Sequence, residues 1–280
     1  MKFIKRGNII KAGFFLIKNN KKTILDDEII IHSGLILFKN EKKKQSSLNI
    51  ENYDIISFFV DYITKNYQSI NFSTIIDFPD LRPFQWHNFG SKKKKFFINP
   101  RYTSKLDISD LAKNKFESNT FKNMSSERKR LLRIGIKKNA LFKYDYDLDF
   151  ILEKYQKFMF AQNNKISSTK IENIKNIILN LEKQNKIIVQ EGYYIGCNFS
   201  YILIFTLDDK TSTFLYGFPI GNIDNTIGTI SFWKMFNLLA EKDVKYINLE
   251  GINSPNRGQF KQSFGGINKV YYNLKYNFDI

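Results

Sequence analysis

The chain is poor in the residues that support stapled or metal-dependent folds. Its 280 residues include one cysteine, Cys197, and two histidines, His32 and His87. A single cysteine excludes an internal disulfide framework, and these three residues have no zinc-ligand spacing. We therefore expect a protein of a reducing compartment that uses no metal.

Long apolar runs are also lacking. The longest stretches, such as residues 12–17, are far shorter than the about 20 residues that span a bilayer. The basic N-terminus leads into an apolar run that Lys11 and Lys18 interrupt, and no small-residue cleavage site follows. The sequence predicts a cytoplasmic protein, or one peripheral to the inner face of the membrane, with no integral membrane association.

Acidic residues are few relative to basic ones. The chain has 44 Lys and Arg against 27 Asp and Glu, a formal net charge of +17. Such an excess favours nucleic acid or an anionic surface as a partner, although the many Lys, Asn and Ile residues are also typical of AT-rich codon usage. Residues 92–95 are four consecutive lysines, which we interpret as a solvated run. Residues 122–138 carry seven basic residues against Glu127, and both phosphate binding and a solvated face remain open there.

Hydrophobic periodicity predicts strands and helices in both halves of the chain. The 42% of hydrophobic residues are enough for one large core or two modest ones. Residues 77–100 are predicted to be a loop. Strands are predicted at residues 9–17, 28–38, 69–76, 186–193, 198–207, 211–218, 244–249 and 269–277, and helices at 51–66, 126–138, 148–159, 168–181 and 227–242.

One stretch joins a strand to a dense set of polar side chains. The apolar run 244–249 is followed by residues 251–266, which supply Asn, Ser, Arg, Gln and Lys side chains and close on Phe264-Gly265-Gly266. Polar side chains at the carboxyl end of a strand form ligand sites in α/β proteins. This stretch predicts a polar pocket for a charged or hydroxylated ligand.

The same stretch resembles the closing motif of the Fem-type (FemABX-like) branch of the GNAT acyltransferase superfamily. In that motif a strand ending in Gly leads to a short helix with Phe-Lys and then Phe-Gly. Other segments that resemble the family precede this motif and occur along the chain in the order that the family has. They are Ile31-His32-Ser33-Gly34-Leu35, Asp107-Ile108-Ser109, the Arg-rich residues 126–130 with Lys137, residues 213–216, and residues 227 onward.

The resemblance implies an α/β (α+β) fold with a GNAT-like mixed sheet flanked by helices. It also implies two tandem GNAT-like units, of which the first is reduced. Residues 1–122 are expected to form the reduced N-terminal unit and residues 123–280 the C-terminal unit, with the site between the two. The second half has the GNAT order of elements: two helices, an antiparallel meander, a helix, a strand, a short helix and a strand.

The resemblance further implies an N-acyltransferase, whose chemistry requires a deprotonated nucleophile and a stabilised oxyanion. Lys261 lies where related peptidyltransferases place a lysine beside the reacting carbonyl. Glu191 lies in the strand that often carries the general base of GNAT enzymes, and Tyr216 is a candidate proton donor. Glu250 is a further carboxylate whose pKa burial beside Leu249 would raise. An exposed lysine, structural or solvated carboxylates and a packed tyrosine are the alternatives.

Polar and aromatic side chains elsewhere are candidates for substrate binding. Trp86 and His87 suit stacking on a sugar ring or nucleobase, or else hold a loop on the core. Ser254-Pro255 suits a helix start as well as a ligand contact. The full set of expected substrate-binding residues is His32, Trp86, His87, Arg128, Asn253, Ser254 and Arg257.

The segment expected to hold the acyl donor departs from the family. Residues 217–229 contain three glycines, without the spacing and the arginine of the loop whose backbone amides bind the pyrophosphate of coenzyme A. Acyl-CoA is the expected donor and aminoacyl-tRNA the alternative. The candidate cofactor-binding residues are Gly221, Asn222, Gly228 and Thr229.

Three functions follow from these patterns. The first is transfer of an acyl group to the amine of a nucleotide- or lipid-linked amino sugar, in surface-polysaccharide or cell-envelope biosynthesis. The second is an aminoacyl-tRNA-dependent peptidyltransferase acting on a peptidoglycan precursor, although the helical arm of some such enzymes is missing. The third is a basic module that binds RNA or anionic lipid. The acyl group, the acceptor and the oligomeric state are not predicted.

Overall fold

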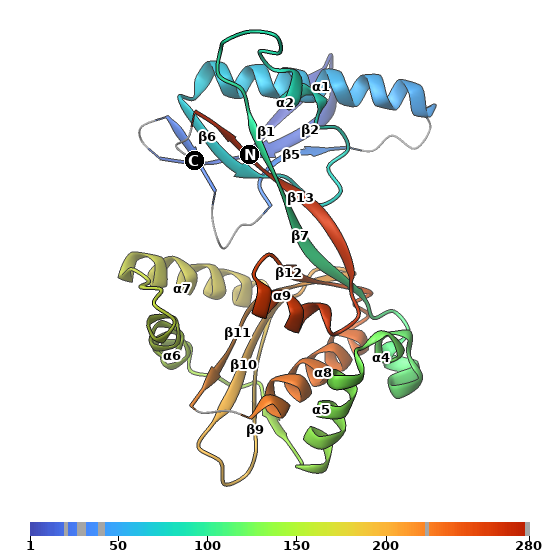
Figure 1. Cartoon of the computed structure of the whole chain (residues 1–280), viewed down its shortest axis with the longest axis vertical. Helices are drawn as coiled ribbons and strands as arrows, with labels where there is room; N and C mark the ends of the chain where they lie inside the picture. Colours follow the sequence, from blue (N-terminus) through green and yellow to red (C-terminus); the bar gives the residue numbers. More distant parts are fainter. Residues whose placement is uncertain (20–21, 27–31, 39–42, 222–223, 278–280) are drawn as a thin grey trace. The chain divides into compact units, whose positions relative to one another are not determined.

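The structure is a computed structural model that describes residues 1–19, 22–26, 32–38, 43–221 and 224–277. The chain forms two compact units (Figure 1). Unit 1 consists of Met1–Tyr102 and Lys269–Ile280, and unit 2 consists of Thr103–Asn268. The chain passes from one unit to the other within the strand β7 (Phe97–Asp107) and again near the start of the strand β13 (Ile267–Tyr276).

Unit 1 is built around the long helix α1, which covers one face of a three-stranded sheet. The strand β2 pairs antiparallel with both β1 and β5. A second set of strands places β4 parallel to β6, and β6 antiparallel to β13. The elements are β1 (Lys2–Arg6), β2 (Ile9–Phe15), β3 (Ile17–Lys18), β4 (Thr23–Leu25), β5 (Gly34–Leu37), α1 (Gln45–Asn66), β6 (Ser69–Ser73), α2 (Arg82–Trp86) and β13 (Ile267–Tyr276).

Aromatic and β-branched side chains form the core of unit 1. Ile56, Phe59 and Ile63 recur at helical spacing on α1 and are fully buried. Phe59 packs edge-on against Phe14 of β2, with ring centroids 5.1 Å apart, and lies near Phe72 of β6. The predicted helix at 51–66 is thus confirmed, although it begins earlier, at Gln45, and Phe58 of its apolar periodicity is exposed.

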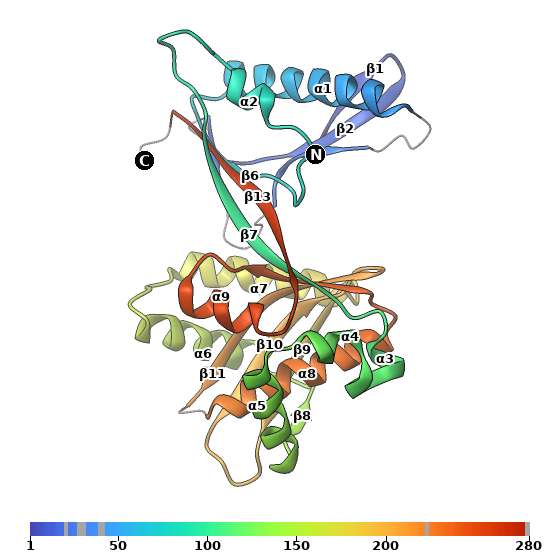
Figure 2. The ribbon, with the colours of Figure 1, turned by 45° about the vertical axis from the view of Figure 1, so that its right-hand side comes forward.

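Unit 2 is a mixed sheet with helices on both faces. Its strand order is β7-β12-β11-β10-β9-β8. Figures 1 and 2 show α6 and α7 on one face of this sheet and α5 and α8 on the other. The elements are β7 (Phe97–Asp107), α3 (Leu111–Asn114), the 3-10 helix η1 (Lys115–Glu117), α4 (Asn119–Asn123), α5 (Ser126–Lys137), β8 (Leu141–Lys143), α6 (Leu148–Ala161), α7 (Ser168–Lys183), β9 (Ile187–Tyr193), β10 (Ser200–Thr206), β11 (Thr211–Ile220), α8 (Asn225–Glu241), β12 (Tyr246–Gly251) and α9 (Pro255–Gln262).

Helix α8 forms the centre of the unit 2 core. It is apolar on almost all sides, as expected for a buried helix. The ring of Phe232 lies within 5.1 to 6.3 Å of six other aromatic rings, including those of Phe214 and Phe264. The closing motif is therefore anchored to the core by the phenylalanines that the sequence singled out.

Two parts of the predicted organisation differ from the structure. Residues 77–100 are not a continuous loop, because they include α2 and the start of β7. Unit 2 begins at Thr103 instead of residue 123, because α3 packs against α8 and β7 pairs with β12. The predicted strand at 28–38 is observed as β5, while residues 28–31 lie outside the described residues.

None of the helices in the described part of the chain is both long enough and apolar enough to span a membrane.

Candidate functional site

The parallel strands β11 and β12 separate after a short pairing. They pair only from Thr211 with Tyr246 to Thr213 with Asn248. Beyond this point β11 continues to Ile220 along β10, while β12 ends at Gly251. The carboxyl end of β12 is therefore freed from its parallel neighbour, at the position where ligands bind in such sheets.

Glu250 lies at this end of β12 in an unusual backbone conformation. The register between β12 and β7 shifts between Asn248 and Gly251, and Glu250 has a φ of +58°. A left-handed conformation at a non-glycine residue is uncommon and costs free energy, so it indicates that the surrounding structure holds this residue in place. The bulge turns the Glu250 side chain into the protein, where it is only 8% exposed.

Asn248 holds Glu250 through two hydrogen bonds. Its amide nitrogen donates to Glu250 Oε1 at 2.8 Å, and its amide oxygen accepts from the Glu250 backbone N–H at 3.0 Å. The hydroxyl of Thr103 on β7 donates to the same Asn248 oxygen. Glu250 Oε2 is buried without a hydrogen-bond partner, so one carboxylate oxygen remains available to a ligand.

Lys261 extends from α9 toward the same strand end. Its ammonium donates to the carbonyl of Gly251 at 3.1 Å and lies 4.9 Å from the centroid of the Phe214 ring. Helix α9 can approach β12 closely because Gly258 has no side chain: a Cβ there would lie 2.4 Å from the carbonyl oxygen of Ile252. The closing motif thus brings a lysine beside a buried carboxylate.

Burial shifts both groups toward their neutral forms. It raises the pKa of Glu250 to about 7, although the nearby Lys261 charge opposes the shift. Burial likewise lowers the pKa of Lys261 to about 8, against the attraction of Glu250 and with a smaller contribution from Arg257. Both pKa values thus lie near neutral pH, as is typical of groups that transfer protons in catalysis.

Glu191 lies away from this pair, and Tyr216 packs against helix α6. Glu191 is on β9, three strand spacings from β12, or roughly 14 Å, and forms an ion pair with Lys143 at 2.7 Å. It lines a separate 290 Å³ pocket. Tyr216 lies beyond the paired part of β11, with its ring 5.0 Å from that of Tyr155 on α6. Glu191 therefore lies apart from Lys261, and the role of Tyr216 as proton donor stays a prediction.

Arg128 lies inside unit 2 and connects three helices. From α5 its guanidinium donates to the hydroxyl of Thr229 on α8 at 2.5 Å and to that of Ser263, just after α9, at 2.9 Å. It also covers the ring of Phe260 at 4.3 Å. Burial lowers the pKa of Arg128. These contacts give Arg128 and Thr229 a role in positioning α9, beside the ligand-binding roles that the sequence suggested for them.

The residues expected to hold the donor lie around the start of α8. The carboxylate of Asp224 caps this helix by accepting from the backbone N–H of Thr226 at 2.8 Å and of Ile227 at 3.2 Å, and it pairs with Lys138. The positive end of the helix dipole is therefore already occupied by an acid. Gly221 adopts a φ of +76° just before this cap. Gly228 lies against the ring of Tyr201 inside α8, and Asn222 lies outside the described residues.

The three residues of the closing motif that are expected to bind substrate are exposed. Ser254 is the N-cap residue of α9, but its side chain makes no capping hydrogen bond. Arg257 donates to the side-chain oxygen of Gln162 at 2.7 Å, and Asn253 is exposed just before α9. All three are on the segment that carries Lys261.

His32, Trp86 and His87 belong to unit 1. The His32 Nδ1 atom lies 2.9 Å from the carbonyl of Thr74 and its Nε2 is buried without a partner, while burial lowers its pKa. Trp86 is half exposed and packs against Tyr53. His87 lies between the rings of Phe96 and Tyr276. These contacts are those of side chains that hold a loop on the core.

Asn248 and Thr103 are the site residues that the sequence analysis missed. The one sequence signal for Asn248 is its place: it is a polar residue within the apolar strand 244–249, two positions before the acid Glu250. Thr103 gave no signal, because its role depends on the pairing of β7 with β12.

Neither a sequence-family model nor a curated protein matches this chain. Solved structures do match in fold. FemX matches with a TM-score of 0.61 at 11% identity, over 97% of this chain and 86% of its own. The C-terminal domain assigned to a lysylphosphatidylglycerol synthetase of Agrobacterium fabrum matches with a TM-score of 0.56 at 11% identity, over 96% of this chain and 82% of its own.

A tandem GNAT protein from the clavulanic acid biosynthesis pathway also matches, with a TM-score of 0.54 at 7% identity, over 99% of this chain and 82% of its own. These matches extend over both units, which confirms the predicted mixed sheet flanked by helices. The chain therefore has the tandem fold of the GNAT superfamily, with FemX among the structures that share it, as the closing motif predicted.

Proposed function

We propose that the chain transfers an acyl group to an amine at the end of β12. The observation that carries this proposal is the juxtaposition of Lys261 with the buried, partly unpartnered carboxylate of Glu250. An ammonium in a dry environment stabilises a developing oxyanion strongly. A carboxylate with a pKa of about 7 is suited to accept a proton at neutral pH.

The reaction that suits this pair is an attack of the acceptor amine on the carbonyl carbon of the donor. A C–N bond forms, and the C–S or C–O bond to the leaving group breaks. Glu250 accepts the proton that the amine loses and returns it to the leaving group, while Lys261 stabilises the oxyanion. In this assignment Glu250 takes the role of base that the sequence analysis gave to Glu191.

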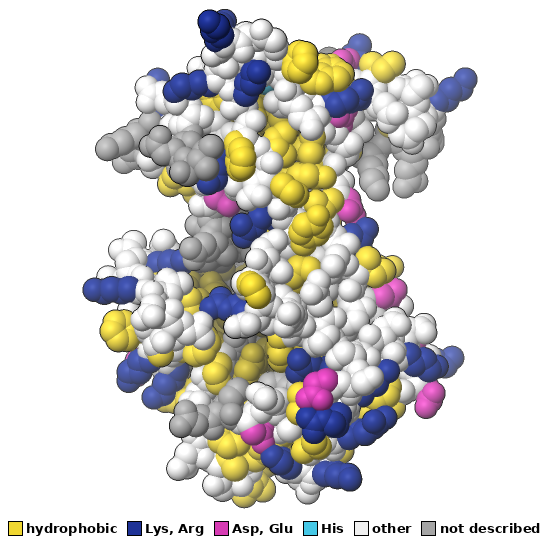
Figure 3. Space-filling model, viewed as in Figure 1, with side chains coloured by type: hydrophobic (Ala, Val, Ile, Leu, Met, Phe, Trp, Pro, Cys, Tyr) yellow, Lys and Arg dark blue, Asp and Glu magenta, His cyan; other side chains and the backbone are white. Residues whose placement is uncertain are grey.

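The acceptor in this proposal is the amine of an amino sugar linked to a nucleotide or a lipid, in surface-polysaccharide or cell-envelope biosynthesis. Its anionic linkage suits a strongly basic chain. Figure 3 shows lysine and arginine side chains crowded on the surface of unit 2 over α5. The reaction would take place in the cytoplasm or at the inner face of the membrane.

Acyl-CoA is the first candidate donor, but one observation favours aminoacyl-tRNA. The carboxylate of Asp224 already caps α8 and pairs with Lys138. A pyrophosphate at this helix end would meet a like charge instead of free backbone N–H groups. A donor recognised through other surfaces avoids this repulsion, and the net charge of +17 suits a polyanion such as tRNA.

The test is transfer activity with both donors. Purified protein would be incubated with nucleotide-linked amino sugars and either acyl-CoA, with thiol release as the readout, or labelled aminoacyl-tRNA, with label transfer as the readout. We expect transfer to the amino sugar with one donor class. Absence of transfer with both classes over the whole acceptor panel would contradict the proposal.

The sharpest prediction concerns Lys261→Met. Loss of the ammonium should lower kcat by about 100-fold or more, as the loss of one oxyanion donor does. Stability should change little, because burial already disfavours the charged lysine. Lys234→Met on the exposed face of α8 is the matched control and should keep full activity. Wild-type turnover by Lys261→Met would remove this lysine from the chemistry.

A further inference from the structure

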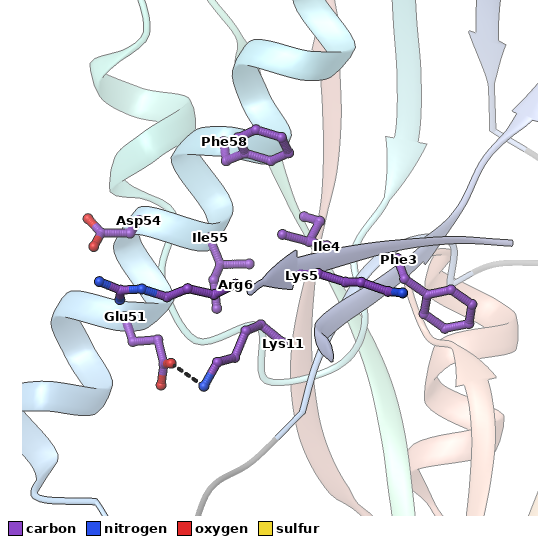
Figure 4. A pocket seen from close by; sticks show the side chains of 9 residues that line it. All are labelled: Phe3, Ile4, Lys5, Arg6, Lys11, Glu51, Asp54, Ile55 and Phe58. Atoms are coloured by element: carbon purple, nitrogen blue, oxygen red, sulfur yellow. Dashed lines mark ion pairs between the residues drawn. The ribbon is translucent and has the colours of Figure 1, made fainter. Parts of the chain in front are cut away.

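A pocket in unit 1 lies between the β1–β2 hairpin and α1. It has a volume of 290 Å³. Ile4 and Ile55 form its apolar floor, and Phe58 of α1 forms one wall (Figure 4). Arg6 extends from β1 over α1 toward Glu51 and Asp54, while Phe3 and Lys5 leave β1 on the side away from Ile4. The pocket thus has an apolar interior and a charged rim.

Large apolar side chains around this pocket are exposed to solvent. Phe3 is 49% exposed and Phe58 is 60% exposed. Ile9 and Ile10, just past the hairpin turn, are 63% and 41% exposed. Ile9 pairs with Arg6 and Ile10 with Lys5 across the hairpin. On the face of unit 1 seen in Figure 3, hydrophobic side chains lie among lysines and arginines. An exposed apolar group of this kind indicates a binding surface.

The charge of the same segment has one sign. The first 25 residues contain seven basic residues and no acidic one. Glu51 and Asp54 of α1 are the two acids that line the pocket. Glu51 is already neutralised by Lys11 at 2.8 Å and Lys43 at 2.7 Å. Within the described part of the chain, no ion pair involves Lys5 or Arg6, so their charges remain available to a partner.

We propose that this hairpin and the rim of the pocket bind the surface of a bilayer that contains anionic phospholipids. Lys5 and Arg6 would contact lipid phosphates, and Ile9, Ile10 and Phe58 would enter the interface. Lys5 with Ile10 and Arg6 with Ile9 lie on opposite faces of the hairpin, so its tip presents a basic and an apolar side chain on each face. Basic and apolar side chains are the two contributions that hold peripheral proteins on anionic membranes. RNA fits less well, because aliphatic side chains at a hairpin tip provide no stacking surface for bases.

The inference does not depend on the acyl transfer proposed above. The test is flotation of the full chain with vesicles of phosphatidylcholine alone, or of phosphatidylcholine and phosphatidylglycerol in equal parts. Lys5→Gln with Arg6→Gln should weaken binding to the mixed vesicles by about 30-fold. Ile9→Ser with Ile10→Ser should weaken it by about tenfold or more. Lys183→Gln with Lys242→Gln, on exposed positions of unit 2, removes the same charge and should leave binding unchanged.

The hairpin residues are exposed, so both double variants should fold, which thermal unfolding would verify. Wild-type protein that ignores the mixed vesicles, or binds pure phosphatidylcholine equally well, would overturn the inference. Hairpin variants that bind vesicles as the control does, but lose binding to tRNA, would also overturn it and assign this surface to nucleic acid. Vesicle binding by a chain without transfer activity would refute only the enzymatic proposal.

Discussion

Glu250 is a buried acid whose ionisation opposes folding. Its pKa in the folded chain is about 7, whereas that of an unfolded glutamate is about 4.3. Between these values the folded chain holds a proton that the unfolded chain has released. The free energy of unfolding therefore falls as pH rises through this window.

Glu250→Gln should remove this pH dependence while keeping the contact with Asn248. We expect the variant to be more stable than wild type by up to about 3 kcal/mol above pH 7, with the difference shrinking toward zero near pH 4. Urea unfolding over a pH series measures this. Glu153→Gln is the control, because Lys157 lowers the pKa of that exposed acid and no gain is expected. A gain for Glu250→Gln that does not vary with pH would contradict the burial argument.

The same two side chains should shape the pH dependence of catalysis. The proposed mechanism needs Glu250 ionised and Lys261 protonated. With pKa values of about 7 and about 8, kcat/KM should rise with pH near 7 and fall beyond 8, giving a narrow bell. The measurement is initial rate against pH at low substrate concentration. A rate that stays constant from about pH 6 to 9 would exclude this assignment of base and cation.

At the scale of elements, Arg128 connects α5, α8 and the end of α9. Arg128→Ala removes two hydrogen bonds from a charged donor and leaves a gap beside Phe260. We expect a loss of about 2 to 4 kcal/mol of unfolding free energy, measured by urea unfolding. Arg130→Ala on the same helix is the control: it breaks only an exposed ion pair with Glu127, which contributes about 1 kcal/mol or less. Equal effects of the two variants would argue against a buried connection.

The elements that the sequence predicted well are those with a strong local signal. The helix predicted at 126–138 is observed as α5, and its N-cap Ser125 accepts from the Arg128 N–H at 3.2 Å. Hydrophobic periodicity did not predict β7, because its buried residues include Thr103 and Ser104 and it shows no apolar alternation. Only the resemblance of Asp107-Ile108-Ser109 to a strand end of the family pointed to it. The candidate site was predicted only in part, again because a local signal was needed. Lys261 is within a recognisable motif, whereas Thr103 and Asn248 act through contacts between distant segments.

At the scale of the whole molecule, unit 1 depends on the last strand of the chain. β13 pairs with β6 from Asn273–Ser73 to Tyr276–Ile70, and Leu274 is fully buried in the unit 1 core. A chain that ends at residue 268 should keep unit 2 folded but lose unit 1. Limited proteolysis with mass spectrometry should then show cleavage within residues 1–102 and protection of 103–268. Leu274→Asp, which keeps the full length, should have the same effect. Protection of residues 1–102 in both variants would contradict this dependence.

The return of β13 to the first unit also delays the folding of that unit during synthesis. Residues 1–102 leave the ribosome first, yet they lack their last strand until the segment after residue 268 has been made. At typical translation rates this delay is roughly 10 to 30 s. Unit 2 is continuous in sequence but is complete only at residue 268, directly before the segment that returns to unit 1. We therefore expect the two units to complete their folding at nearly the same time, with the unfinished N-terminal sheet exposed to chaperones until then.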